Sequence, residues 1–595
     1  MKPPLERLPD AAIVAASLAG TTHAAEVVRL AEGVLARRFP LLGYEIETGP
    51  KIDWRCDYVS GKSSGVDYFR GVPYLDFERV GDHKVVWELN RHQHLVLLAQ
   101  AWRLTGRPEF LRDIEAQLEG WWGENPYGYG INWASALEVA FRALSWIWVF
   151  HLAGDTLSEQ FRRRLLDSLY LHGRHISGNL SVYFSPNTHL MGEAVALHAI
   201  GVLFPEFPRA RRWRREAADM VRAQMRAQVQ ADGSHFEHSS YYHVYALDML
   251  VFSASIEPMP ADYIEGLTRM AEYLDALLGP QRRLPFFGDD DGGRLFHPYG
   301  VRDRFGCGSL AAFGDASVHD GDYDEIGAWW LAGRALGKIA SRRGSRFFEN
   351  SGLAVMENGD MHLVADAGPF GIGRAGHSHS DTLSFVLRRG EEDLLIDAGT
   401  YTYVASAQLR NWFRGSAAHN TVRIDGLDQA TPEGPFRWMD KPEVQKIAWS
   451  TDEQSDFLAA ICRYRGYEHL RRIQYVKPSL ILVVDEITGP PGEHLIEQFW
   501  HSGESVNEVS SRQFRLGRHA RLRLSHAGEL TTGGENGWRS RAMGSKEPAA
   551  VIRVAVRGAF PMQLTAAIDL DGNADPSAIS AAFQQLGIET RGSFG

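Results

Sequence analysis

The stretch Gly376-His377-Ser378-His379-Ser380-Asp381-Thr382-Leu383-Ser384-Phe385 carries the strongest structural signal in this sequence. Apolar residues alternate onward from it to Leu387. Arg389-Gly390-Glu391-Glu392 then leads into the apolar run Leu394-Leu395-Ile396. Two apolar segments joined by a short polar one predict a β-hairpin. The His-x-His spacing can present two imidazoles on one face of a strand.

The ends of this hairpin, His379 and Asp397, are expected to lie in one neighbourhood, and His419 follows in the next polar segment. Two imidazole nitrogens and one carboxylate oxygen make a donor set that suits zinc. His377 then remains, one pleat away, for chemistry. The alternative is a set of polar residues at a strand entrance, satisfied by hydrogen bonds. The residues alone do not decide between the two.

The composition is that of a globular protein with room for large cores. The chain has 595 residues, 44% hydrophobic and 23% charged. Its net charge of −11 argues against general nucleic-acid binding, yet a local basic cleft could still take an acidic ligand. The many Trp and Tyr residues suit stacking on sugar rings, but they also fill cores. Three widely separated cysteines form neither a disulfide framework nor a cysteine zinc motif.

The N-terminal segment Ala11–Gly20 resembles a weak signal peptide. Its flanking charges are balanced, and the apolar pattern continues at helical spacing as far as Leu35. We therefore interpret it as an amphipathic first helix. The compartment stays open between bacterial periplasm or cell envelope and cytoplasm. No later run is expected to be long enough to span a membrane.

The pattern of apolar residues divides the chain into two parts. Residues 85 to about 340 predict successive helices separated by Gly, Pro and Asn turns, which indicates helical hairpins in an α/α array. From about Phe347 onward, short apolar runs such as Leu480–Val484 predict antiparallel strands in a sandwich. We expect two domains, residues 1–340 and 347–595, joined by the linker Ser341–Arg346.

The segment Ser185–Ala194 is the first polar cluster of the helical part. Pro186 is a good helix-entry residue, so Asn187 and His189 are expected near a helix N-terminus, where an anionic group is favoured. The alternative is that Asn187 serves only as a helix cap.

The second cluster, Asp232–Tyr245, opens with an Asp-Gly turn and then crowds three His and three Tyr into the start of a helix. Any of these tyrosines could exchange protons if cationic neighbours lowered its pKa from about 10. The alternative is a packing face rich in Tyr and His.

Two further segments are ambiguous. The acidic run within Leu284–Arg294 lacks the ligand spacing of a calcium loop, so we predict a structural turn at the rim of the helical array. In Asn132–Arg142, Trp133 can stack on a sugar or fill the core. Glu138 and Arg142 stand four residues apart and can pair on one helix.

Taken together, these motifs resemble the heparinase II/III-like family of polysaccharide lyases, from about Arg91 to about Trp500. The ordered set is specific, although each piece alone is modest. The segments that carry the resemblance are Asn187-x-His189-Leu190-x-Gly192-Glu193-Ala194; Asp232-Gly233-Ser234 with Glu237-x-Ser239 and Tyr242-His243; Gly376–Phe385; Asp397-x-Gly399-Thr400-Tyr401; and His419-Asn420-Thr421. Thr188 departs from the pattern, because many relatives carry Asn directly before the motif His.

The resemblance implies an N-terminal (α/α) toroid followed by a C-terminal antiparallel β-sandwich. The implied activity is β-elimination on a uronate-containing acidic polysaccharide, such as a glycosaminoglycan or exopolysaccharide, which leaves a 4,5-unsaturated uronate end. In this reaction the sugar carboxylate must be neutralised before a base can remove the C5 proton. An acid then protonates the departing O4.

The resemblance also implies roles for single residues. Asn187 and His189 would neutralise the sugar carboxylate, Tyr242 would be the acid/base with help from His243, and His377 would be the second base. Zinc, in a structural role, would be bound by His379, Asp397 and His419. The expected substrate-binding residues are Arg91, Asn132, Trp133, Arg142, Glu237, Tyr401, Arg410 and Arg414.

Two other classes of function remain as alternatives. A glycoside hydrolase acting on an acidic exopolysaccharide would need two catalytic carboxylates. The candidates are Glu138, Glu193, Glu237 and Asp289. A non-catalytic glycan-binding protein of exopolysaccharide production would need none. The joint presence of Tyr242, His243 and His377 favours an enzyme.

Overall fold

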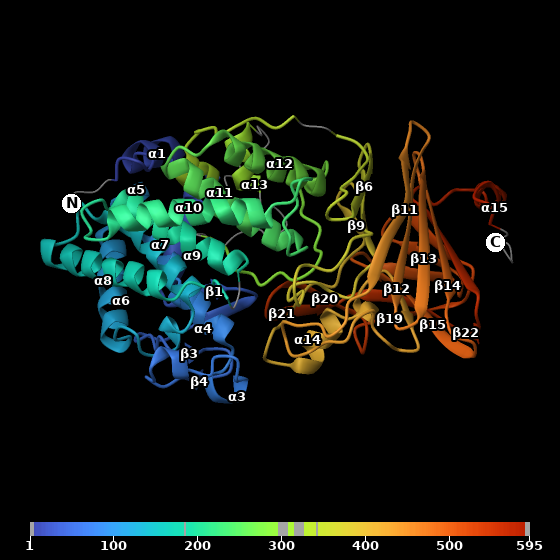
Figure 1. Cartoon of the computed structure of the whole chain (residues 1–595), viewed down its shortest axis with the longest axis horizontal. Helices are drawn as coiled ribbons and strands as arrows, with labels where there is room; N and C mark the ends of the chain where they lie inside the picture. Colours follow the sequence, from blue (N-terminus) through green and yellow to red (C-terminus); the bar gives the residue numbers. More distant parts are fainter. Residues whose placement is uncertain (1–4, 184–185, 296–306, 315–325, 341–342, 589–595) are drawn as a thin grey trace. The chain divides into compact units, whose positions relative to one another are not determined.

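The computed structural model describes residues 5–183, 186–295, 307–314, 326–340 and 343–588. The chain packs into two compact units that are interleaved along the sequence (Figure 1). Unit 1 comprises Met1–Gly233, His243–Glu272 and Gly292–Ala340; unit 2 comprises Ser234–Tyr242, Tyr273–Asp291 and Ser341–Gly595. Ser185 and the linker residues Ser341 and Arg342 lie outside the described residues. The division at residues 340 and 347 stays a prediction.

Unit 1 holds the helices of the predicted (α/α) toroid. The toroid helices, with the ends of α11 and α12 reaching into unit 2, are α4 (His83–Asn90), α5 (Gln93–Thr105), α6 (Pro108–Glu124), α7 (Ala136–Ala153), α8 (Glu159–Gly178), α9 (Thr188–Leu203), α10 (Ala210–Gln228), α11 (Ser240–Ile256) and α12 (Ala261–Leu278). Helix α7 packs against both α5 and α9, and each of these three helices also packs against its sequence partner, α6, α8 or α10. This is a double layer of helical hairpins.

The inner and outer helices differ in their sequence pattern. Helix α7 is apolar around its circumference and buried along its whole length, whereas α10 buries one stripe and exposes its charged face. By length and composition alone α7 could cross a membrane, contrary to the expectation from the sequence. Its entire apolar window lies inside unit 1, however, as in the core helix of a toroid.

The N-terminal prediction of one amphipathic helix is wrong. The segment forms α1 (Ala11–Leu18) and α2 (Thr22–Leu35), bent by 107° with respect to each other. Gly20 has φ 81°, and the Thr21 side chain caps α2 by accepting a hydrogen bond from the Ala24 N–H. A glycine in the left-handed region followed by a capping threonine ends one helix and starts the next.

Unit 2 consists of antiparallel sheets around a common apolar core, as predicted for a sandwich. The five-stranded sheet is β5 (Arg346–Phe347), β6 (Leu353–Asn358), β7 (Met361–Asp366), β8 (Phe385–Arg389) and β9 (Glu392–Leu395). The eight-stranded sheet runs β11 (Glu443–Thr451), β12 (Ser455–Tyr464), β13 (Tyr467–Val476), β14 (Leu480–Thr488), β23 (Met562–Asp569), β18 (Ala520–Leu524), β17 (Gln513–Leu516) and β16 (Val506–Ser510). The four-stranded sheet runs β10 (Val422–Ile424), β15 (Glu493–Ser502), β22 (Ala550–Ala559) and β19 (Gly528–Thr532).

The predicted hairpin is confirmed as β8 and β9, in which Leu387 pairs with Leu395. The preceding residues His377–Ser384 are not part of a strand, so the prediction that a strand presents the two imidazoles is wrong. Leu383 has φ 65°, and the Ser384 N–H donates to the Asp381 carbonyl at 2.8 Å. This turn keeps the polar residues in a loop that leads into the sheet.

Candidate active site and metal cluster

Tyr242 and His377 form the centre of the candidate site in unit 2. Their rings stack with centroids 4.0 Å apart and an interplanar angle of 29°. Tyr242 lies at the start of α11 and is 3% exposed, while His377 lies in the loop before β8 and keeps some exposure. Their neighbourhood joins two motifs that are far apart in the sequence.

Two carboxylates hold the His377 ring. Its Nδ1 lies 3.1 Å from Asp289 Oδ2, and its Nε2 lies 3.3 Å from Glu237 Oε2. Burial lowers the pKa of His377, but the hydrogen bond to Asp289 and the charge of Glu237 outweigh this effect, so its pKa is raised above the usual value. The carboxylates therefore stabilise the imidazolium form.

Asp289 is the hub of this network and is fully buried. Arg410 Nη1 donates to Asp289 Oδ1 at 2.5 Å and Nη2 donates to Oδ2 at 2.7 Å, a bidentate pair. Burial raises the pKa of Asp289, but Arg410 and the two imidazoles outweigh burial and hold it well below the usual range. The prediction that this acidic run is a structural turn at the toroid rim is wrong, because Asp289 packs inside unit 2.

Gly288 explains how Asp289 reaches this position. It has φ 66°, and a Cβ added to it would lie 2.7 Å from the His377 carbonyl oxygen. The adjacent Asp289 N–H donates to the same carbonyl at 2.8 Å. Only glycine permits such a close approach in this conformation.

Tyr242 has acidic rather than cationic neighbours at its hydroxyl. Its OH lies 3.3 Å from Asp291 Oδ2 and 3.4 Å from the Tyr403 OH. Burial, followed by the charge of Asp291 and the proximity of Tyr403, raises the pKa of Tyr242 well above 10. The condition set by the sequence, a pKa lowered by cationic neighbours, is therefore not met at Tyr242, and its hydroxyl keeps its proton at neutral pH.

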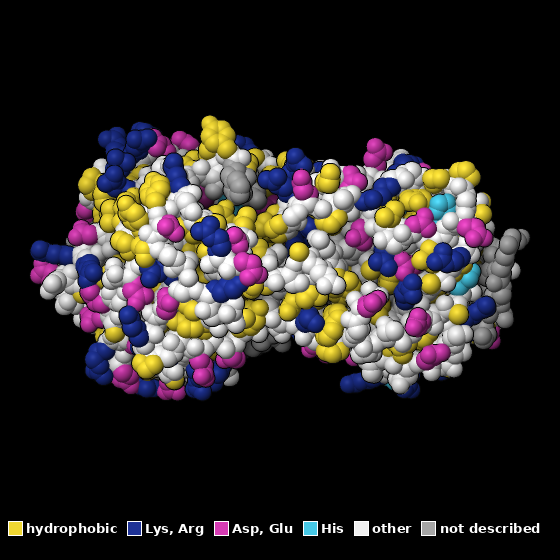
Figure 2. All heavy atoms as spheres, turned by 90° about the horizontal axis from the view of Figure 1, so that it is seen from below, with side chains coloured by type: hydrophobic (Ala, Val, Ile, Leu, Met, Phe, Trp, Pro, Cys, Tyr) yellow, Lys and Arg dark blue, Asp and Glu magenta, His cyan; other side chains and the backbone are white. Residues whose placement is uncertain are grey.

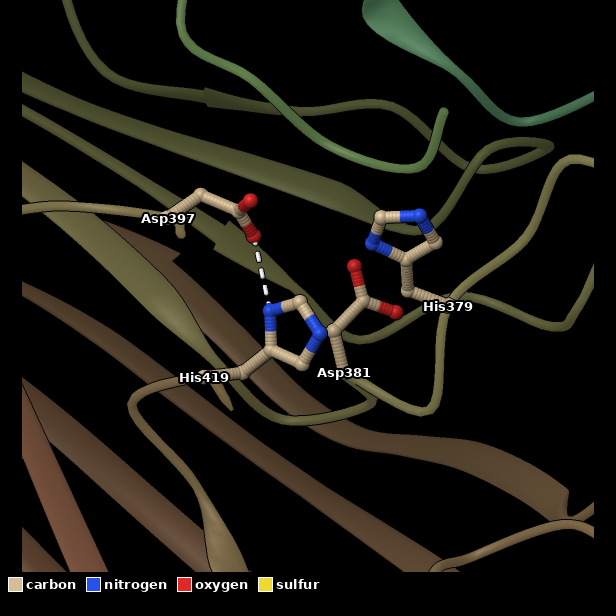
Figure 3. A group of neighbouring side chains, drawn as sticks. All are labelled: His379, Asp381, Asp397 and His419. Atoms are coloured by element: carbon tan, nitrogen blue, oxygen red, sulfur yellow. Dashed lines mark hydrogen bonds and ion pairs between the residues drawn. The ribbon is translucent and has the colours of Figure 1, made fainter. Parts of the chain in front are cut away.

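A second cluster in unit 2 gathers four potential metal ligands. They are His379, Asp381, Asp397 and His419, all buried, with one ligand atom from each lying within 4.8 Å of the others (Figure 3). His379 and Asp381 come from the loop before β8, Asp397 follows β9 and His419 precedes β10. The predicted approach of His379, Asp397 and His419 is confirmed, and Asp381 is added to them.

The hydrogen bonds of the two imidazoles leave one nitrogen of each available. His379 Nε2 lies 2.9 Å from Asp289 Oδ1, and His419 Nδ1 lies 2.8 Å from Asp397 Oδ2. Within the described part of the chain, the buried His379 Nδ1 and His419 Nε2 have no hydrogen-bond partner. Two such lone pairs beside two carboxylates fit a divalent metal ion.

The sequence contained a signal for Asp381, which stands two residues after His379 in the opening motif. It held none for Tyr403 or for the position of Asp289. These two residues reach the site through long-range packing, with Arg410 lying 4.9 Å above the Tyr403 ring.

In unit 1, Asn187 and His189 lie at the N-terminus of α9, as predicted, and both are partly exposed. The Asn187 side chain accepts a hydrogen bond from the His189 N–H at 3.1 Å, so it does cap the helix. His243 is buried, with Nε2 3.0 Å from the Met270 carbonyl oxygen. Burial lowers the pKa of His243 to about 4, and the ring is neutral at neutral pH.

Four residues of unit 1 that were expected to bind substrate are buried: Arg91, Asn132, Trp133 and Arg142. Arg91 forms a bidentate ion pair with Glu138, and Arg142 donates to His172 Nε2 and to backbone carbonyls. Trp133 packs against His172 at 4.9 Å. This environment favours a structural role for all four residues. For Trp133 it favours the alternative that the ring fills the core.

The expected substrate-binding residues of unit 2 differ in accessibility. Arg410 and Arg414 are buried, and both donate to the Pro435 carbonyl in addition to their side-chain partners. Tyr401 is partly exposed, with φ 65°, and Glu237 contacts His377. The buried guanidinium groups of Arg410 and Arg414 therefore position other residues of the site. Tyr401 leaves part of its side chain exposed to solvent.

The four hydrolase candidates do not form a catalytic pair of free carboxylates. Asp289 is bonded to Arg410, and Glu138 to Arg91. Glu193 accepts hydrogen bonds from the Ser181 N–H at 2.7 Å and from the Ser181 hydroxyl at 2.6 Å. Glu237 lies beside an imidazole rather than beside a second free carboxylate.

Similar proteins are found for both halves of the chain. Residues 13–294 match the family described as Heparinase II/III N-terminus, and residues 340–581 match Heparinase II/III-like, C-terminal. A heparin-sulfate lyase of Bacteroides stercoris is 23% identical over 78% of this chain and 72% of its own length. A heparin-sulfate lyase of Pedobacter heparinus is 24% identical over 74% and 67%.

Solved structures share the fold. A crystal structure of heparinase III has a TM-score of 0.70 at 17% identity, covering 92% of this chain and 85% of that one. Chondroitin AC lyase of Streptomyces coelicolor A3 has a TM-score of 0.56 at 14% identity, covering 94% and 80%. The two family matches, one for the helical part and one for the strand-rich part, take in most of the sequence. The chain therefore belongs to the heparinase II/III-like family of polysaccharide lyases.

Proposed function

We propose that this polysaccharide lyase cleaves a uronate-containing acidic polysaccharide by β-elimination, with Tyr242 and His377 as the proton-transfer pair. The observation that carries the proposal is the stacking of a protonated phenol on an imidazole held by two carboxylates. The relatives named heparin-sulfate lyases make a glycosaminoglycan the first substrate class to test.

The two residues suit opposite proton transfers. Neutral His377 can take the C5 proton of the uronate, and Asp289 and Glu237 stabilise the imidazolium that forms. Tyr242 retains its proton and can donate it to O4 as the C4–O4 bond breaks. A C4=C5 double bond forms in the uronate, and the released chain leaves as an alcohol.

Neutralisation of the sugar carboxylate is assigned to Asn187 and His189. They lie at a helix N-terminus, whose unpaired N–H groups and dipole favour an anion. A neutralised carboxylate lowers the free energy of the enolate-like charge that develops as the C5 proton leaves. The role of these two residues in neutralisation is a prediction, and Asn187→Ser tests it for the Asn187 amide.

We assign zinc to the cluster of His379, Asp381, Asp397 and His419. When bound, zinc would supply the positive charge that joins the loops carrying these residues, and so would fix the loop that bears His377. Zinc analysis of the purified protein should give about one ion per chain, and His419→Ala should lose it. His519→Ala, in an exposed turn before β18, is the control and should keep its zinc. If wild-type protein that has been supplied with zinc does not bind about one ion per chain, the assignment is excluded.

The catalytic proposal is tested by the ultraviolet absorbance of the 4,5-unsaturated uronate on a panel of uronate polysaccharides. Tyr242→Phe should reduce turnover by about 10²- to 10⁴-fold, the usual contribution of one acid–base group. Tyr183→Phe is the matched control, because Tyr183 is 97% exposed. New reducing ends without absorbance would indicate hydrolysis, and binding without turnover in wild type would indicate a non-catalytic protein.

A further inference from the structure

Unit 1 carries a group of exposed aromatic rings outside the residues discussed so far. Tyr68, Tyr127 and Tyr129 are 54%, 42% and 46% exposed. Tyr68 packs against Phe69 at 4.8 Å and against Tyr129 at 6.0 Å. We call these four residues the tyrosine platform. Exposed large rings gathered in one place are unusual on a surface that binds nothing.

The backbone holds the platform rigidly. Tyr68 and Tyr129 form an antiparallel bridge, the Phe69 N–H donates to the Gly128 carbonyl at 3.1 Å, and the Gly130 N–H donates to the Asp67 carbonyl at 2.7 Å. Tyr127 rests edge-on against buried Trp133 at 5.0 Å. Trp133, for which the sequence left both sugar stacking and core packing open, therefore lies one layer below exposed tyrosines.

Two guanidinium groups accompany the platform. Arg70 lies 5.5 Å from the Phe69 ring centre and donates to Asn179 Oδ1 at 3.1 Å. Arg174 is exposed and directly precedes His175, whose ring lies 4.8 Å from the Phe69 ring and 6.1 Å from the Tyr127 ring. Among the residues that the structure describes, neither arginine has a carboxylate partner, whereas basic and acidic side chains lie close together over much of the surface in Figure 2.

Hydrogen bonds also connect the platform with helix α9. Arg70 bonds to Asn179, and two residues later Ser181 donates twice to Glu193 of α9. The same helix carries Asn187 and His189 at its N-terminus. A continuous set of contacts within unit 1 thus connects the exposed rings with the residues assigned to the sugar carboxylate.

We propose that the tyrosine platform, with Arg70 and Arg174, is a subsite for an anionic sugar residue of the polysaccharide. The phenol rings offer flat apolar faces for a pyranose ring, and the guanidinium groups can bind its carboxylate or sulfate. The inference rests on the proposed function for the identity of the polymer, while the binding surface itself is independent of turnover.

The test measures binding by calorimetry in a Tyr242→Phe background, which separates binding from cleavage. The probes are a heparin-derived oligosaccharide, its desulfated counterpart and a neutral cello-oligosaccharide. Arg70→Ala with Arg174→Ala should weaken heparin-oligosaccharide binding roughly tenfold or more, the loss expected for charge-assisted hydrogen bonds. If the double variant also binds the desulfated probe more weakly than the parent does, the guanidinium groups bind the sugar carboxylate.

Matched variants separate the subsite from general effects. Arg215→Ala with Arg226→Ala on α10 removes the same charge from exposed positions and should leave the affinity unchanged. Tyr68→Phe with Tyr129→Phe keeps the rings and should bind normally, whereas the corresponding Ala pair should not. Platform variants that bind as tightly as the parent, or a parent that binds none of the probes, would overturn the proposal. Wild-type turnover on the same glycans reports separately on the proposed function.

Discussion

Tyrosine is used in opposite ways in the two units. Tyr242 of unit 2 is 3% exposed, lies among carboxylates and has a raised pKa. Tyr68 of unit 1 is 54% exposed and stands one residue before Phe69, whose ring contacts Arg70. The buried phenol retains its proton at neutral pH, whereas the exposed phenol offers a surface. The environment, rather than the residue type, sets the chemistry.

The same contrast applies to the charges. In unit 2 the buried guanidinium of Arg410 is matched by a buried carboxylate and by backbone carbonyls. In unit 1, Arg70 is exposed and can be solvated. A buried charge must be paired because desolvation costs several kcal/mol. An exposed charge is solvated by water and remains available to bind a ligand. Breaking pairs in each unit therefore sharpens the comparison.

The largest expected effect on stability is that of Asp289→Ala. The change leaves Arg410 buried without its carboxylate and removes a partner from both His377 and His379. We expect a loss of about 3–5 kcal/mol in the free energy of unfolding of unit 2. Denaturant unfolding followed by the near-ultraviolet signal measures it.

An exposed ion pair provides the control for Asp289→Ala. Glu433→Ala breaks a contact with Arg374 in the same unit, 3.4 Å long, with side chains 44% and 65% exposed. This change should cost less than about 1 kcal/mol. Equal losses for the two variants would contradict the buried hub described here.

A smaller effect is expected from Glu193→Gln in unit 1. Burial raises the pKa of Glu193 to about 7, against hydrogen bonds from Ser181 that lower it. A carboxyl group with a raised folded pKa stabilises the fold fully below its unfolded value of 4.5, and this stability is lost as the pH rises through about 7. The difference corresponds to about 3 kcal/mol.

Unfolding of wild type and Glu193→Gln at pH 5 and pH 8 checks this prediction. The variant should gain stability relative to wild type at the higher pH, because it has no carboxyl group to ionise. Glu216→Gln, on the exposed face of α10, should follow wild type at both values. A constant difference between wild type and Glu193→Gln would show that Glu193 ionises normally.

Local patterns in the sequence predicted part of this structure. The alternation around Leu387 and Leu395 predicted the hairpin, and the hairpin brought His379 and Asp397 together. The successive helices predicted from residue 85 onward likewise include α7 and α9. In each case the signal and the structure lie within a few turns or one strand pair.

The parts that failed depend on contacts between distant segments. Nothing periodic in Leu284–Asp291 showed that Gly288 would pack on the His377 carbonyl and bring Asp289 below the imidazole. The pKa of Tyr242 rises because the phenol is buried and because Asp291 and Tyr403 lie beside it, and neither of these residues is a neighbour in the sequence. Sequence could therefore identify the residue types of the site but not their electrostatic environment.

The smallest expected stability effect concerns Asn187, whose two possible roles can be separated. Asn187→Ala removes the cap of α9 and should cost about 1 kcal/mol in the unfolding of unit 1. Asn187→Ser keeps a capping oxygen but has no amide, so it should preserve the stability within a few tenths of a kcal/mol. If Asn187 only caps the helix, Asn187→Ser should also keep full lyase turnover. If its amide neutralises the sugar carboxylate, Asn187→Ser should lose turnover while remaining as stable as wild type, because the amide has this anionic partner only when substrate is bound.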